Sequence, residues 1–76
     1  MQETKIILKD IQSVRDFVKQ VVMLDYEVDL VQGRYIVDAK SIMGIFALDI
    51  LSPITLKAHT DNADAFFAAI DGFIVK

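Results

Sequence analysis

The sequence predicts an α+β domain, an open-faced β-sandwich in which a four-stranded, mainly antiparallel sheet carries three helices on one face. The period of the apolar residues changes repeatedly between two and about 3.6 along the chain, which gives the element order β-α-β-β-α-β-α. Each predicted helix has a single apolar stripe. The predicted strands alternate apolar and polar residues, as antiparallel strands with one buried and one solvated face do.

The first predicted elements are a strand at residues 5–9 and an amphipathic helix after it. The strand is short, β-branched and flanked by lysines. Asp10 and Ser13 are both candidate N-caps of the helix, because their side-chain oxygens can accept from free N–H groups of the first turn. Apolar residues at i, i+3, i+4, i+7 and i+8 form the helix stripe: Val14, Phe17, Val18, Val21 and Val22.

A β-hairpin is predicted next. Tyr26, Val28 and Leu30 alternate with acidic residues along its first strand, and residues 34–38 form the returning strand. Gln32-Gly33 is the predicted turn, in which the glycine supplies the positive φ that a tight hairpin needs.

A short second helix is predicted after Ser41, which is a good N-cap, with Asp49 near its end. Gly44 inside this helix lowers helix stability by about 1 kcal/mol relative to alanine. It therefore argues against the helix unless the close approach of a neighbouring segment demands a glycine there.

The last predicted elements are a strand that Pro53 opens and a third helix that Thr60 or Asp61 caps. The strand alternates Ile54, Leu56 and Ala58 with polar residues. The remaining core residues are expected on the third helix and beyond Gly72: Ala63, Phe66, Phe67, Ile70, Phe73 and Ile74.

The composition limits the classes of function. The chain has no cysteine, which excludes disulfides and thiolate metal sites, and its net charge of −3 gives no basic face for nucleic acid. No apolar stretch approaches the ~20 residues of a membrane span, and the start of the chain does not have the pattern of a signal peptide. We therefore expect one cytoplasmic domain over residues 1–76.

No catalytic constellation is visible, and no cofactor or metal site is expected. His59 is the only histidine, and it lies too late in the chain for N-terminal chemistry. We expect it to face solvent or to cap a helix. Asp61 and Asp64 near it do not by themselves make a metal site.

The residues 39–44, Ala-Lys-Ser-Ile-Met-Gly, open the second helix, and Phe17-Val18-Lys19 lie in the first. With the element order, these residues resemble the HPr phosphocarriers of the bacterial sugar phosphotransferase system. The chain is closest in character to Crh, the histidine-less regulatory relative of these proteins in Gram-positive bacteria. The resemblance covers nearly the whole chain in element order and implies the HPr-like fold.

The loop before the first helix departs from the family pattern. In HPr proteins this loop carries a Gly-Leu-His-x-Arg-Pro motif, whose histidine accepts a phosphoryl group. Alignment on residues 17–19 places Asp10 at the histidine, Ile11 after it, Gln12 at the arginine and Ser13 at the proline. The imidazole nucleophile and the neighbouring cation are both missing, and Asp10 would repel a phosphate. We therefore expect no phosphoryl relay through this loop.

The second helix holds the candidate regulatory and docking residues. Ser41 can be an N-cap only, but the resemblance implies phosphorylation there by a dedicated serine kinase, followed by binding to a transcription regulator. A phosphate at Ser41 would meet the positive end of the helix. The partner-binding candidates form a dense apolar group, for which core packing is the alternative: Ile42, Met43, Ile45 and Phe46.

The leading hypothesis is a non-enzymatic, HPr-like regulatory or protein-binding module, at most a phosphoryl-accepting carrier. A structural or dimerising module, with Ser41 only a cap, is the second hypothesis. The third is a residual phosphocarrier that uses Asp10 or His59. The expected partners are proteins, and the expected state is a monomer or a weak dimer.

Overall fold

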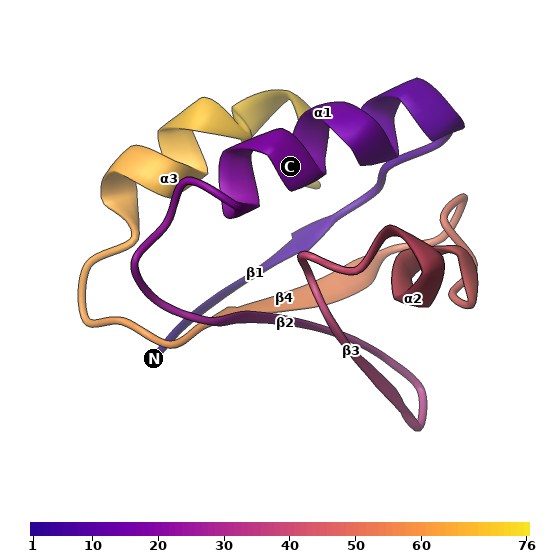
Figure 1. Ribbon diagram of the computed structural model, residues 1–76, viewed down its shortest axis with the longest axis horizontal. Helices are drawn as coiled ribbons and strands as arrows, with labels where there is room; N and C mark the ends of the chain where they lie inside the picture. Colours follow the sequence, from indigo (N-terminus) through magenta and orange to yellow (C-terminus); the bar gives the residue numbers. More distant parts are fainter.

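The computed structural model describes residues 1–76 and has two layers, a sheet and three helices that cover one face of it (Figure 1). Neighbouring strands are antiparallel throughout, in the order β1-β4-β2-β3, and the predicted fold class is confirmed. The strands are β1 (Gln2–Ile6), β2 (Val28–Gln32), β3 (Tyr35–Asp38) and β4 (Ile54–Ala58). The helices are α1 (Ile11–Val21), α2 (Ile42–Phe46), α3 (Asp64–Ala69) and a 3-10 turn, η1 (Asp71–Phe73).

The core lies between the two layers and contains no polar or charged side chain, so hydrophobic burial alone holds it. Alternate residues of β4 are completely buried against the helices. The ring of Phe17 on α1 packs against Phe66 and Phe73, with centroids 6.4 and 6.3 Å away. The predicted stripe of α1 is correct except at its last residue, Val22, which is the C-cap of the helix and is exposed. None of the helices has the length and apolar character of a membrane span.

The first strand lies earlier in the chain than the predicted residues 5–9. Its pairing with β4 begins at Gln2 opposite Ala58 and ends at Ile6 opposite Ile54. The chain then leaves the sheet, and Lys9 turns it with a φ of 75°. Ile6 and Leu8 of the predicted segment do enter the core, but the position of β4 decides where strand pairing begins and ends.

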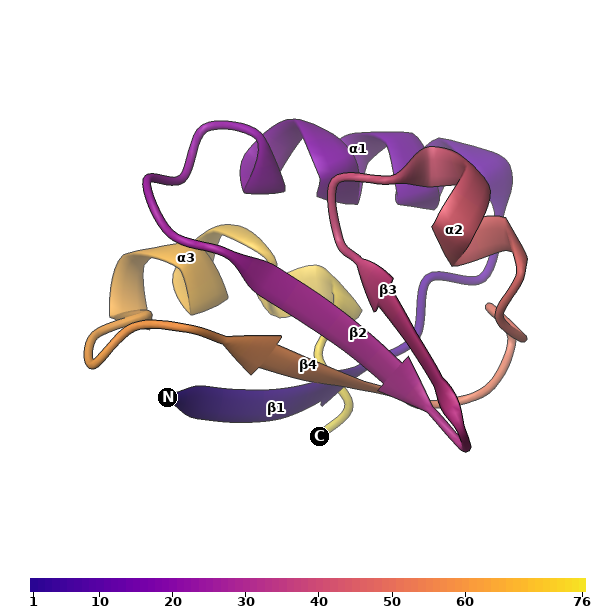
Figure 2. The same ribbon diagram turned by 60° about the horizontal axis from the view of Figure 1, so that its bottom comes forward.

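The far side of β1 is covered by the chain's own last residues. Ile74 forms an antiparallel bridge with Ile6, and the Val75 N–H donates to the Lys5 carbonyl at 2.8 Å. Figure 2 shows this end of the chain beside β1, whereas β3 lies on the opposite side of the sheet with only β2 beside it. The two edges of the sheet are therefore unequal.

The hairpin forms as the glycine predicts. Gln32 pairs with Tyr35 across a two-residue turn that begins at Gly33, whose φ is 60°. Glycine at the first central position of such a turn is typical of type II′, which matches the twist of the strands. The strand itself begins at Val28, so Tyr26 precedes it.

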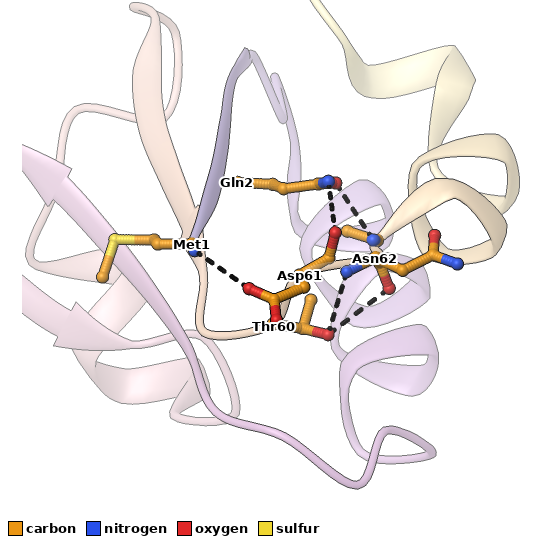
Figure 3. Close-up of polar contacts among 6 residues, drawn as sticks. Met1, Gln2, Thr60, Asp61 and Asn62 are labelled. Carbon is orange, nitrogen blue, oxygen red and sulfur yellow. Dashed lines mark hydrogen bonds and ion pairs between the residues drawn. The ribbon is translucent and has the colours of Figure 1, made fainter.

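The predicted cap of the last helix is wrong. Helix α3 begins after Ala63, and neither Thr60 nor Asp61 caps it. Gln2, at the start of β1, holds this segment instead (Figure 3): its amide nitrogen donates to the Asp61 carbonyl at 2.8 Å, and its amide oxygen accepts from the Ala63 N–H at 3.0 Å. A cap that comes from 61 residues away in sequence leaves no local signal.

This arrangement predicts the effect of Gln2→Ala. The loss of both hydrogen bonds should lower the free energy of unfolding by about 1 kcal/mol, measured by urea unfolding. Gln2→Glu keeps the acceptor for the Ala63 N–H and loses the donor for the Asp61 carbonyl. Its free energy of unfolding should therefore lie between those of the natural protein and Gln2→Ala. Gln12→Ala is the control, because its exposed bond to Asp16 within one helix is worth only about 0.2–0.5 kcal/mol. Equal losses for Gln2→Ala and Gln12→Ala would show that Gln2 does not hold the loop.

Candidate functional site

Asp10 is the N-cap of α1. Its carboxylate accepts from the Ser13 N–H at 2.8 Å. This backbone hydrogen bond, with help from the Ser13 hydroxyl and the Lys9 charge, holds the pKa of Asp10 below its ordinary value of 3.8. Gln12 donates to Asp16 one turn along the helix, not to Asp10. The loop is therefore organised around a negatively charged helix cap, which the positive end of α1 stabilises.

Ser41 is the N-cap of α2, as the sequence predicts. Its hydroxyl oxygen accepts from the Gly44 N–H at 3.0 Å, and the side chain is exposed. A Cβ added at Gly44 would lie 3.1 Å from the Ser41 Oγ and 3.3 Å from the Cβ of Val37 on β3. A side chain at this position would therefore crowd both neighbours, which favours glycine in spite of its low helix propensity.

The apolar residues of α2 divide between the core and the surface. Ile45 is completely buried, so the prediction of a partner contact at Ile45 is wrong: this is the one face of the helix that turns toward the sheet. Ile42, Met43 and Phe46 are exposed, and 83% of Met43 is accessible to solvent. A buried anchor and three exposed apolar side chains on one short helix are consistent with a docking element.

Two more exposed apolar residues lie at the same end of the fold. The Lys9 N–H donates to the Ile50 carbonyl at 3.0 Å, which brings the start of α1 beside the loop that follows α2. Ile11, two residues after Lys9, and Leu51, the residue after Ile50, are both exposed. Leu51 was missed in the sequence because a single leucine in a loop gives no pattern. We define the α2 surface by five residues: Ile11, Ile42, Met43, Phe46 and Leu51.

His59 lies far from the α1 cap. It follows the end of β4, whereas Asp10 follows the end of β1, and the two strands are antiparallel. The length of β4, about 17 Å, therefore separates the histidine from the α1 cap. Its Nε2 lies 2.8 Å from the Asp29 carboxylate, and both side chains are partly exposed. This pairing across two strands is not visible in the sequence.

An open pocket of about 520 Å³ adjoins this pair and is lined by Tyr26, Glu27, Asp29 and His59. Glu27 is already engaged with Lys40, at 3.2 Å. The hydrogen bond and the charge of Glu27 raise the pKa of Lys40, and burial followed by the charge of Asp25 raises that of Tyr26. No group of three or more potential metal ligands is present. The two acids and the histidine of the pocket are thus paired within the chain, Glu27 with Lys40 and Asp29 with His59.

No protein-family model matches this chain, and no curated protein matches it. Among solved structures, it is similar to the crystal structure of HPr-C-His from Thermoanaerobacter tengcongensis, with 23% sequence identity and a TM-score of 0.77. The match covers 95% of this chain and 89% of the other. This likeness establishes the HPr-like fold. At this identity it does not transfer an activity.

The charge of the α1 cap predicts a pH dependence of stability. Asp10→Asn keeps a good N-cap acceptor but removes the charge. Because folding lowers the pKa of Asp10, the carboxylate stabilises the fold above its unfolded pKa, and this contribution is lost as the pH falls through the folded pKa. We expect the natural protein to have the higher Tm near pH 7, with the difference narrowing below about pH 4. Thermal unfolding followed by circular dichroism measures the two Tm values at each pH. A Tm difference that does not change with pH would contradict the prediction.

Proposed function

We propose that this protein is a non-enzymatic, HPr-like regulatory module that acts by protein–protein contact through the α2 surface, under the control of phosphorylation at Ser41. The observation that carries the proposal is the exposed Ser41 hydroxyl at the start of a helix whose outer side presents Ile42, Met43 and Phe46. A kinase can reach the hydroxyl, and a partner can reach the apolar side chains next to it.

The organisation of the α1 cap supports a regulatory role over a phosphocarrier role. In HPr proteins a histidine at this loop accepts the phosphoryl group, and the resemblance aligns Asp10 with it. Here the Asp10 carboxylate accepts a hydrogen bond from the Ser13 N–H, and the pKa of Asp10 lies below its ordinary value. It is therefore a charged cap, which repels phosphate. Gln12, aligned with the family's arginine, brings no positive charge and is bonded to Asp16.

Phosphorylation at Ser41 would act mainly by charge. The hydroxyl oxygen already faces the free N–H groups of the first turn of α2, so a phosphate has donors at hand and little refolding is needed. Two negative charges would then stand beside an exposed apolar group. A partner that recognises both features needs a cationic side chain next to an apolar pocket, and the resemblance points to a transcription regulator as that partner.

A second candidate is a structural or dimerising module in which Ser41 is only a cap. It is favoured by the cap geometry itself, since the hydrogen bond to Gly44 gives Ser41 a sufficient structural reason. A residual phosphocarrier would need a free acceptor. Asp10 is bonded to Ser13 and His59 is paired with Asp29.

The proposal predicts one phosphorylation site. Incubation with the serine kinase that acts on HPr proteins should add a single phosphate, read by intact mass, and Ser41→Ala should abolish it. Ser41→Asn is the sharper variant, because asparagine keeps the N-cap acceptor and removes the hydroxyl. It should fold with an unchanged Tm and remain unmodified. Phosphate transfer from the upstream phosphoenolpyruvate-dependent enzyme of the family would overturn the proposal in favour of a carrier.

The α2 surface predicts the effect of Met43→Lys on partner binding. A charged side chain at the centre of an apolar contact should weaken binding of the Ser41-phosphorylated protein to its regulator by about tenfold or more, measured by titration calorimetry. Met23→Lys is the matched control, since Met23 is a similarly exposed methionine at the far end of α1, outside the α2 surface. Equal effects of the two substitutions would place the contact elsewhere.

A further inference from the structure

The two edges of the sheet differ in what covers them. The outer side of β1 is bonded in part to the C-terminal residues, through Ile74 and Val75. The outer side of β3 has no strand beside it. A bare strand edge presents unpaired N–H and C=O groups that can pair with another chain.

The register of the hairpin identifies the free groups of β3. The Ala39 N–H donates to the Val28 carbonyl, so the hydrogen-bonded pairs of this ladder alternate from there, through Val37, to Tyr35. The backbone groups of Ile36 and the N–H of Asp38 therefore point away from β2, while the Asp38 carbonyl accepts from Ser41. The Ile36 side chain is 70% exposed.

The sequence of this edge is self-complementary about Ile36. Arg34 precedes Ile36 by two residues and Asp38 follows it by two. In an antiparallel pair of two identical strands centred on Ile36, Arg34 of each copy lies opposite Asp38 of the other. Neither side chain has an ion-pair partner within the chain. Opposite charges across paired strands are favourable, and like charges there are unfavourable.

We propose that β3 is a homodimerisation edge, at which two copies of this chain pair antiparallel about a two-fold axis through Ile36. The two Ile36 residues exchange their N–H···O=C bonds, as a hydrogen-bonded pair does. Arg34 and Asp38 form two symmetric ion pairs, and Tyr35 lies opposite Val37. The two sheets then join into one that continues across the axis, with an isologous interface.

A second copy fits this edge better than an unrelated strand does, because one strand supplies both members of the charge pair in the antiparallel register. The contact is small beside a stable dimer interface, so the association is weak and depends on concentration. The proposed dimer contact involves backbone groups and charges at the β3 edge and no residue of the α2 surface. It is therefore independent of the proposed function.

Sedimentation velocity on the full chain at concentrations up to about 1 mM tests the proposal. The natural protein should show a reversible monomer–dimer equilibrium. Arg34→Glu and Asp38→Arg should each place like charges opposite one another and weaken dimerisation by about tenfold or more. An equimolar mixture of the two variants should recover the natural association, because each then supplies the charges that the other needs.

The mixing experiment separates the proposed contact from a folding defect, since two misfolded variants would not restore association. Ile36→Pro gives a second test, because it removes an N–H that points away from β2 and should leave the hairpin ladder intact; it should abolish the dimer while circular dichroism confirms the fold. A natural protein that stays monomeric at the highest concentration would overturn the proposal. So would a dimer that none of these substitutions weakens.

Discussion

Burial of the apolar face of β4 beneath the helices is the interaction on which the rest of the structure depends. β4 pairs with β1 on one side and β2 on the other, and Ile54, Leu56 and Ala58 are completely buried. The chain has no disulfide, and no polar group contributes to the core. Packing against this strand therefore fixes α1 and α3, and removing one of its larger side chains would cost about 2–5 kcal/mol.

Because the apolar core is sufficient to hold the fold, the helix ends are free to carry function. Asp10 and Ser41 lie at the starts of α1 and α2, are exposed, and bind only local N–H groups. A change at either position alters a cap and a charge without opening the core. This separation explains how a chain can keep the HPr-like fold while the residues that the resemblance aligns with the phosphocarrier loop become a negative cap.

The two contacts that we propose differ in kind. The α2 surface consists of apolar side chains beside the exposed Ser41 hydroxyl, so under our proposal its affinity for a partner would respond to side-chain chemistry and to phosphorylation. The β3 edge consists of backbone groups and a pair of opposite charges, so its recognition depends on register. Gly44 packs closely between Ser41 and Val37, so α2 lies directly against β3.

The sequence by itself determined what depends on neighbours along the chain: the element order, the cap Ser41, the choice of Asp10 or Ser13 as the cap of α1, and the positive φ of Gly33. These features follow from local hydrogen bonds and from the period of the apolar residues. Only the tertiary structure decided that Gln2 holds the start of α3, that His59 pairs with Asp29, and that Ile45 is buried while Met43 is exposed. The physical reason is that the Gln2 and His59 contacts join residues far apart in sequence, and that the short helix α2 has an inner side only after β3 and α1 have been placed against it.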